Sequence, residues 1–287
     1  MQASFFSSPR LLKLFRFFLF LIAFCAAFRG TASAEPISKF LWVECEGTNR
    51  TIDSVAHVDA MLKDAKAWGI NAIFVQVYRG DRAWFDSDIC DASPYAAFRK
   101  KEGKDMLSYL LDSAHRRGIK VYAWFNTFRI GKDPKARVLR KLGRDAVTRD
   151  NKGRSLLDYP KLQLPGNENT YYEADGTGYW LEPGDPGVQE YLLSLLRELM
   201  SKYPELDGVQ LDFARLPYVV PFSPGARFPK GITYGYGKRS VDRFRAATKW
   251  DPLHWDGATA SAMAWDDWRR GQITEFVRKA RKEVRKR

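Results

Sequence analysis

Cysteine and histidine are scarce in this sequence, each occurring three times in 287 residues. The histidines, His57, His115 and His254, are scattered along the chain. A catalytic zinc ion normally takes three protein ligands, and a structural one takes four. The sequence therefore offers no metal centre, which argues against a polysaccharide deacetylase built on an Asp/His metal cluster. We expect neither a metal nor a cofactor.

Other missing patterns limit the class of protein further. No Gly-x-Gly-x-x-Gly follows a predicted strand and no phosphate-cradling loop is visible, so a nucleotide-binding fold loses its main support. No Gly/Ser-rich or Pro-rich linker divides the chain beyond its first 34 residues. The remainder has the length of one large domain or two small ones.

The net charge of +13 is concentrated at the two ends of the chain. The first 34 residues carry four basic residues and no acid, and the final ten, RKARKEVRKR, hold seven basic residues against Glu283. Because the body between is close to balanced, a nucleic-acid partner is poorly supported. The basic end fits the polar face of a last helix, with an anionic envelope polymer as the alternative reading.

Residues 1–34 have the pattern of a secretory signal peptide. Basic residues precede the apolar run FFLFLIAFCAAF, and Ala32, Ser33 and Ala34 form a small-residue cleavage site. The run is too short to span a bilayer comfortably, so we expect no stable membrane insertion once the signal is removed. We expect an exported protein, periplasmic or extracellular, whose mature chain forms one domain over residues 35–287.

Two cysteines, Cys45 and Cys90, remain after signal removal, and each stands just after a predicted strand. An oxidising compartment permits a disulfide between them. Sequence alone does not show that they are close, so their pairing stays open, as does the oligomeric state.

Strands and helices alternate along the mature chain, which predicts an α/β fold with parallel strands. Apolar alternation predicts strands over 40–44, 71–78, 120–128, 179–186 and 209–213. Helical spacing predicts helices over 55–68, 106–114, 135–142, 188–199 and 273–284. Five β/α units of this kind suggest either a doubly wound sheet or a (β/α)8 barrel of the TIM type.

Polar residues near the ends of several strands favour the barrel. Each lies on the strand face opposite the aliphatic one, and in a barrel such residues converge on one site, whichever strand supplies them. The predicted rim consists of Gln76, Asn126, Glu182 and Asp212 from the strands, with Arg79, Asp81, Arg129 and Arg215 from the loops.

A rim of carboxylates, amides, guanidiniums and aromatic rings fits glycoside hydrolysis better than acyl transfer. That reaction needs two carboxyl groups roughly 5–10 Å apart. Glu182 and Asp212 come from neighbouring predicted strands and are the candidate catalytic pair, with Arg215 keeping one carboxylate ionised. The structural alternatives are an Asp212–Arg215 ion pair that closes a loop, Glu182 as the cap of the helix near Asp185, and an Arg79–Asp81 pair.

Several motifs resemble one family in their order along the chain. KFLWVE, WGINAIFVQVYRGDRAWF, AHRRGIKVYAWFNTFR, YWLEPGDPGVQEYL and DGVQLDFARLPY resemble the glycosyl-hydrolase-like family 10 domain of bacterial envelope proteins. The resemblance implies a (β/α)8 barrel that acts on peptidoglycan glycan strands, preferentially those stripped of peptides. The matched positions are Asp212 and Arg215 in an Asp-x-x-Arg-x-Pro element, Gln76, Arg79 and Asp81 in the second strand, Trp124, Asn126 and Arg129 in the third, and Trp268 and Arg269 ahead of the last helix.

The sequence departs from the family pattern in two places. The fourth-strand motif reads Leu-Glu-Pro-Gly instead of Leu-Asp-Pro-Gly, which makes the side chain at Glu182 one methylene longer. No segment before Arg287 suits strands six to eight, so we expect a barrel truncated after about five β/α units. We expect an exported glycoside hydrolase of a peptidoglycan-type or other envelope polysaccharide, and the alternative is a non-catalytic glycan-binding or scaffold domain.

Overall fold

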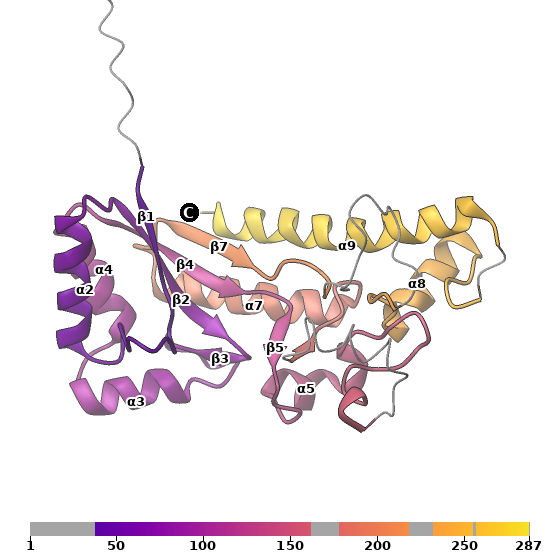
Figure 1. Ribbon diagram of the computed structural model, residues 1–287, viewed down its shortest axis with the longest axis horizontal. Helices are drawn as coiled ribbons and strands as arrows, with labels where there is room; N and C mark the ends of the chain where they lie inside the picture. Colours follow the sequence, from indigo (N-terminus) through magenta and orange to yellow (C-terminus); the bar gives the residue numbers. More distant parts are fainter. Residues whose placement is uncertain (1–37, 162–177, 218–231, 255–256, 287) are drawn as a thin grey trace, which may run out of the picture. The chain divides into compact units, whose positions relative to one another are not determined.

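The computed structural model describes residues 38–161, 178–217, 232–254 and 257–286 (Figure 1). The signal peptide predicted for residues 1–34 lies outside these ranges. Within them, no helix combines the length and the apolar composition needed to cross a membrane.

Four parallel strands form the central sheet, in the order β1 (Phe40–Val43), β2 (Ala72–Arg79), β4 (Lys120–Asn126) and β7 (Gly208–Asp212). A short strand, β3 (Arg82–Ala83), turns back and pairs antiparallel with β2. The register sets Phe74 beside Tyr122 and Asn126 beside Asp212. Because all four strands run the same way, their carboxyl ends lie at one edge of the sheet.

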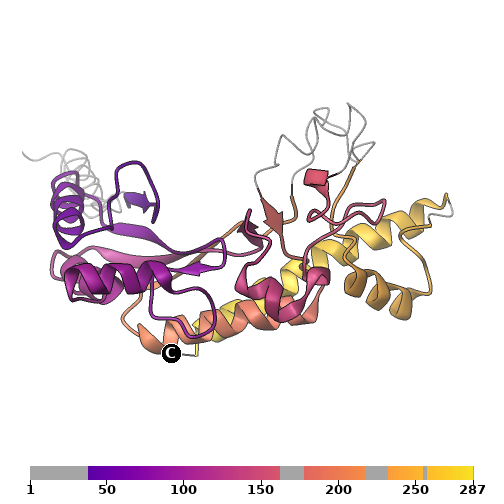
Figure 2. The same ribbon diagram turned by 90° about the horizontal axis from the view of Figure 1, so that it is seen from below.

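Each parallel strand is followed by a long helix that packs on the sheet, as Figures 1 and 2 show. The helices are α2 (Val55–Ala67), α4 (Met106–His115), α7 (Pro186–Lys202) and α9 (Thr259–Val284). Apolar residues at helical spacing, such as Leu107, Leu110 and Leu111 in α4, are buried against the aliphatic face of the strands, where Val75 and Val121 are fully enclosed. The described residues therefore make four β/α units.

The opposite face of the sheet carries aromatic side chains. Phe74 stacks on Phe40 and Trp42, with ring centroids 5.5 and 4.9 Å apart, and also contacts Tyr122 at 5.3 Å. Phe40 and Trp42 are 44% and 54% exposed. The fold is the predicted α/β class with a mostly parallel sheet, and within the described residues this sheet does not close into a barrel.

The predicted fourth strand takes a different place. Tyr179 and Trp180 form β6, which pairs antiparallel with β5 (Arg129–Gly131) in a separate two-stranded sheet. This pairing needs glycine, because a Cβ on Gly178 would lie 2.7 Å from the carbonyl oxygen of Gly131. The parallel sheet consequently holds four of the five predicted strands.

The sequence patterns did not predict several of the helices. The segment that precedes the last predicted helix contains α8 (Lys238–Thr248), and α9 begins at Thr259, well before residue 273. Helix α3 (Ser93–Glu102) was also unpredicted, whereas the predicted basic helix is present as α5 (Arg137–Leu142). Two 3-10 turns follow, Arg144–Ala146 and Tyr159–Lys161. Helices α3 and α8 were not predicted because their sequences are strongly polar and few apolar positions mark their buried faces.

A bulge in β2 moves Tyr78 away from its predicted face. Simple alternation places Tyr78 with Phe74 and Gln76, but the register with β4 shifts between Gln76 and Tyr78. Tyr78 is instead fully buried on the helix-covered side, where it stacks on Phe125 at 4.3 Å.

Asp81 is buried between the β2–β3 turn, α5 and α7, although its motif suggested a substrate-binding residue. Tyr78 and Tyr191 donate hydroxyl hydrogen bonds to Oδ1 at 3.1 and 2.7 Å, and the amide of Val138 donates to Oδ2 at 2.7 Å. Burial raises the pKa of this carboxyl group. One side chain thus ties the β2–β3 turn to α5 and α7.

Replacing Asp81 by alanine tests this structural role. Asp81→Ala leaves two buried hydroxyls and one amide without their acceptor, so we expect a loss of about 3 kcal/mol in the free energy of unfolding, measured by urea denaturation. Asp88→Ala, at a side chain 85% exposed, is the control and should change stability by less than about 0.5 kcal/mol. Equal stability of the two variants would contradict the role.

Candidate active site

Three of the predicted rim residues form a row along the carboxyl edge of the parallel sheet. Gln76 at the end of β2 donates from Nε2 to Asn126 Oδ1 at 3.2 Å, and both side chains are buried. Asn126 stands next to Asp212 in the register, where the Thr127 amide donates to the Asp212 carbonyl at 2.8 Å. Pairing of parallel strands thus brings together residues separated by over a hundred positions in sequence.

The Asp212 carboxylate is held by two donors. The indole nitrogen of Trp124 donates to Oδ2 at 2.9 Å, and the amide of Phe213 donates to Oδ1 at 2.7 Å. These bonds fix the carboxylate on the same side of the sheet as Trp124, which is the side opposite the helices. Asp212 itself is half-buried, so the group stays accessible.

Phe213 has a backbone conformation that is rare for a bulky residue. Its φ is +50°, in the left-handed region that favours glycine. Residues held in this region commonly cluster at functional sites, where the surrounding structure maintains the strain. Here the turn ends β7 directly after Asp212 and aims the Phe213 amide at its carboxylate.

Two guanidinium groups lie against aromatic rings beside this strained turn. Arg129 is 5.2 Å from the centre of the Phe213 ring, and Arg215 is 5.4 Å from the same ring and 4.7 Å from that of Trp180. The two aromatic rings meet edge to face at 5.5 Å. The described contacts of Arg215 are therefore with aromatic rings, and its role as the electrostatic partner of Asp212 stays a prediction.

Cys45 completes the row on the β1 side. Its thiol and its amide both approach Gln76 Oε1, at 3.1 and 3.4 Å. Burial, followed by the nearby charge of Glu46, raises the pKa of the thiol to about 12, so Cys45 acts as a neutral donor. Since Gln76 Oε1 accepts from Cys45, its amide nitrogen is left to face Asn126.

Cys45 and Cys90 are both buried free thiols, and no disulfide joins them. Cys90 lies next to Ser87, 3.5 Å from its hydroxyl oxygen. Burial likewise raises the Cys90 pKa to about 12.

Arg79 lies at the edge of the row and approaches Glu46. Its Nε is 4.0 Å from Glu46 Oε2, while Arg82 approaches the other oxygen of Glu46 at 2.6 Å. Asp81 is enclosed by other partners, so the structural alternative of an Arg79–Asp81 pair is not the arrangement found.

Glu182, the second candidate acid, is also enclosed. Thr148 Oγ1 donates to Oε2 at 2.8 Å, and the amides of Gly237 and Gly184 donate at 3.0 and 3.1 Å. Burial is the main cause of the raised pKa of this carboxyl group. It follows β6, outside the parallel sheet, so it does not come from a strand next to β7 as predicted. The helix cap is Asp185, whose side chain accepts from the Gly187 amide at 2.8 Å.

Four residues of this region were absent from the predicted rim: Cys45, Glu46, Trp180 and Phe213. The rule used elsewhere, that polar residues directly after a strand face the site, would have found Cys45 and Glu46 after β1. Nothing local in the sequence marks Phe213, because its ring position depends on an unusual φ. In the part of the chain that the structure describes, no group of three or more His, Cys, Asp or Glu residues is arranged to hold a metal ion.

Comparison with known proteins identifies the family of this chain. Residues 37–286 match the sequence profile described as "Glycosyl hydrolase-like 10". The chain belongs to this family. This confirms the resemblance drawn from the motifs.

Two curated relatives are glycosyl hydrolases by name. The chain is 30% identical to the glycosyl hydrolase DigH of Escherichia coli strain K12 over 231 residues, which cover 79% of this chain and 42% of that protein. It is 24% identical to the glycosyl hydrolase YngK of Bacillus subtilis, over 78% of this chain and 36% of that protein. The chain thus spans about two fifths of the length of these relatives.

Solved structures show the fold alone. The catalytic domain of a Paenibacillus polymyxa β-amylase aligns with 87% of this chain and 63% of its own, with a TM-score of 0.52 and 14% identity. An α-L-fucosidase isoenzyme from Paenibacillus thiaminolyticus aligns with 86% of this chain and 30% of its own, with a TM-score of 0.50 and 16% identity. These neighbours are TIM-barrel glycosidases, so the four β/α units belong to that barrel type.

Gly237 tests how tightly Glu182 is held. A Cβ at this position would lie 2.4 Å from Glu182 Cγ, so Gly237→Ala should displace the carboxylate and cost about 1–3 kcal/mol of stability, measured by thermal unfolding. Gly271→Ala in α9 is the matched control: a Cβ there meets nothing within 4 Å, and the variant should be stabilised by about 0.5–1 kcal/mol. A neutral Gly237→Ala would show that Glu182 is free to move.

Proposed function

We propose that this chain is a glycoside hydrolase acting on an envelope polysaccharide of the peptidoglycan type. The observation that carries the proposal is the accessible Asp212 carboxylate, fixed by Trp124 at the carboxyl edge of the sheet beside a strained turn. In barrels of this type, the carboxyl edge is where catalytic residues lie. Membership of the glycosyl hydrolase-like family supports the reaction class.

The surroundings of Asp212 suit a sugar chain. Trp124 presents a ring next to the half-buried carboxylate, so aromatic stacking and hydrogen bonding to Asp212 are available together. Arg129 and Arg215 contribute positive charge on the β7 side. The family resemblance, which implies peptide-free glycan strands, supports the choice of peptidoglycan.

One finding favours a second candidate, a non-catalytic glycan-binding or scaffold domain. Hydrolysis needs two carboxyl groups, and Glu182 has its oxygens occupied by three protein donors. A rim with one usable acid would bind glycan without cleaving it. The two candidates differ in turnover and agree in binding.

Removing the Asp212 charge separates these candidates. Purified protein is incubated with peptide-free glycan strands and the products are resolved by chromatography and mass spectrometry. Asp212→Asn should lower turnover by roughly a hundredfold to ten-thousandfold, the range for loss of an acid or base, while the fold is kept. Asp267→Asn, at an exposed carboxylate of α9, should keep full turnover.

Each other outcome has a clear meaning. Turnover that survives Asp212→Asn would refute the catalytic role of this residue. Glycan binding without turnover in the unmodified protein would refute the hydrolase and support the scaffold.

Export completes the proposal, and it rests on the signal pattern of residues 1–34. Cleavage after Ala34 would deliver a chain that begins at Glu35 to the periplasm or the cell exterior. Intact-mass measurement of the protein from the periplasmic and secreted fractions of a bacterial host should give this mature chain. Full-length protein confined to the cytoplasm would contradict export.

A further inference from the structure

Gln76 and Asn126 form the buried centre of the row at the carboxyl edge of the sheet. Gln76 is 3% exposed and Asn126 is 2% exposed. A buried amide group needs partners, and leaving its oxygen or its nitrogen without one costs free energy. Both residues belong to the predicted rim, yet their burial leaves little of either side chain for a glycan to touch. Their role therefore depends on the hydrogen bonds that they make inside the protein.

A backbone group sets the orientation of the Gln76 amide. The main-chain nitrogen of Cys45 can only donate a hydrogen bond, and it approaches one end of this amide at 3.4 Å. That end must be the oxygen, Oε1, which also accepts from the Cys45 thiol at 3.1 Å. Because the thiol is neutral, it keeps the hydrogen that this bond requires. Nε2 of Gln76 then faces the other way, toward Asn126.

Gln76 in turn sets the orientation of Asn126. Nε2 of Gln76 can only donate, so the Asn126 atom that lies 3.2 Å from it is the oxygen, Oδ1. The nitrogen Nδ2, which is a donor, is the end of the Asn126 amide left for the β7 side. On that side the register places Asp212 directly beside Asn126, on the same face of the sheet.

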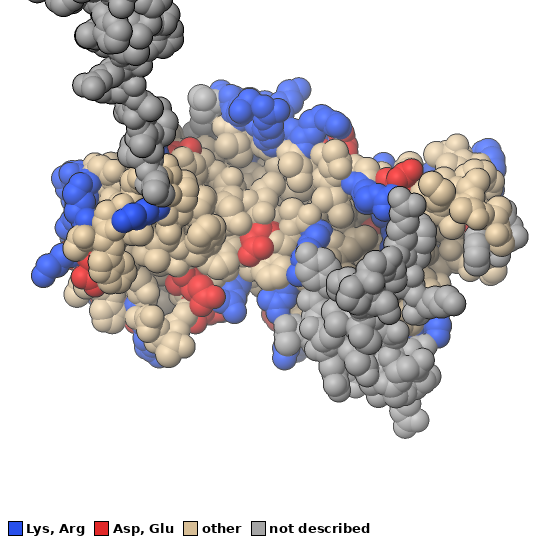
Figure 3. All heavy atoms as spheres, turned by 45° about the horizontal axis from the view of Figure 1, so that its top comes forward, with Lys and Arg blue, Asp and Glu red and all other residues tan. Residues whose placement is uncertain are grey.

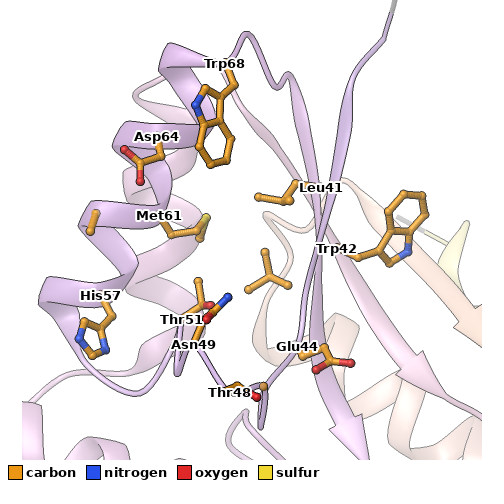
Figure 4. A pocket seen from close by; sticks show the side chains of 13 residues that line it. Leu41, Trp42, Glu44, Thr48, Asn49, Thr51, His57, Met61, Asp64 and Trp68 are labelled. Atoms are coloured by element: carbon orange, nitrogen blue, oxygen red, sulfur yellow. The ribbon is translucent and has the colours of Figure 1, made fainter.

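The end of β1 brings Cys45 to this position. Figure 4 shows Leu41 turned toward α2, with Trp42 on the other side of the strand. The pairing of β1 with β2 stops at Val43 and Val75, so Cys45 lies just beyond it, against the next residue of β2, Gln76. Cys45 is 8% exposed, which shields its bond to Gln76 from water.

The hydrogen bonds of this series all point the same way, from β1 toward β7. Aligned dipoles reinforce one another in a buried site, and their positive ends here lie on the side of the Asp212 carboxylate. Asp212 receives its described hydrogen bonds from Trp124 and Phe213, so the Asn126 amide acts on it through its dipole. With that amide reversed, Oδ1 would face the carboxylate and repel it.

The concentrated basic charge of the chain lies at a different place. Figure 3 shows Lys and Arg side chains gathered along the top of the view, over the C-terminal half of α9. In Figure 1 the C-terminal end of α9 lies beside the start of β7, whereas the row lies where the strands end. On the β2 side of Asn126, oriented amides rather than this basic cluster therefore set the local field.

We propose that Cys45, Gln76 and Asn126 are positioning residues that form one relay, which keeps the donor end of the Asn126 amide turned toward Asp212. In this relay Gln76 acts through Asn126 and does not contact the glycan. The effect of the relay on turnover rests on the proposed hydrolase function. The orientation of the two amides does not, because it is measured without substrate.

Steady-state kinetics on peptide-free glycan strands test the role of Gln76. Gln76→Met keeps a side chain of similar size and removes both polar groups, so Asn126 loses the partner that orients it. We expect kcat to fall by about tenfold or more, the scale of one lost hydrogen bond, while KM stays within about twofold. A raised KM with an unchanged kcat would overturn the proposal, because it would show that Gln76 binds the glycan directly.

Two substitutions of Cys45 separate hydrogen bonding from packing. Cys45→Ala removes one of the two donors to Gln76 Oε1 and should lower kcat by about three- to tenfold. Cys45→Ser keeps a donor and should restore most of kcat. Cys90→Ala is the matched control, since it removes a buried thiol that lies next to Ser87, and it should keep kcat and KM. Equal losses in Cys45→Ala and Cys45→Ser would reduce Cys45 to a packing residue and overturn the relay.

Nuclear magnetic resonance of the side-chain amides tests the relay without substrate. The NH2 signals of Gln76 and Asn126 should exchange slowly with solvent in the unmodified protein. Cys45→Ala should shift both signals and Gln76→Met should shift that of Asn126, whereas Cys90→Ala should leave both in place. An Asn126 signal that neither Cys45→Ala nor Gln76→Met moves would overturn the relay. If the unmodified protein lacks turnover, the hydrolase is refuted and these signals still decide the relay.

Discussion

The pairing of β4 with strands on both sides is the constraint on which the rest of the structure depends. Its aliphatic face, with Val121 and Ala123, is fully buried under the helices. Its other face presents Tyr122, Trp124 and Asn126. Because β2 and β7 are registered against this one strand, Gln76 and Asp212 are brought to either side of Asn126. The hydrophobic burial that fixes β4 therefore also fixes the candidate site.

Three aspartate and glutamate side chains in family motifs have different environments. Asp81 and Glu182 each accept three hydrogen bonds from protein groups, and burial raises the pKa of both. They hold turns and helix ends together. Asp212 accepts two bonds from Trp124 and Phe213 and stays half-buried. Of the three, only Asp212 has the access that a reacting group needs.

A parallel sheet with one uncovered face is an unusual arrangement. A parallel sheet is normally covered on both faces, and here the aromatic face around Phe74 and Tyr122 is covered by no helix among the described residues. The α/β class and the family are shown, and the sheet of the described residues has β1 at one side and β7 at the other.

Much of this could be predicted from particular residues. Continuous apolar runs predicted β2 and β4, helical spacing predicted α2, α4 and α7, and alternation placed Gln76, Asn126 and Asp212 on one face. The rule failed at Tyr78, where a bulge inserts one residue, and at Tyr179 and Trp180, whose partner β5 was hidden in a loop. A local sequence pattern does not show which distant segment a short strand will pair with.

The sequence by itself determined the α/β class, the family and the strand ends that carry polar side chains, because period-two and period-3.6 apolar patterns are local properties. Only the tertiary structure decided which polar side chains are buried and which stay accessible. Burial and hydrogen bonding depend on segments far apart in the chain: Val138 and Tyr191 enclose Asp81, and Thr148 and Gly237 enclose Glu182. Asp212 remains accessible because its partners, Trp124 and Phe213, hold it from one side.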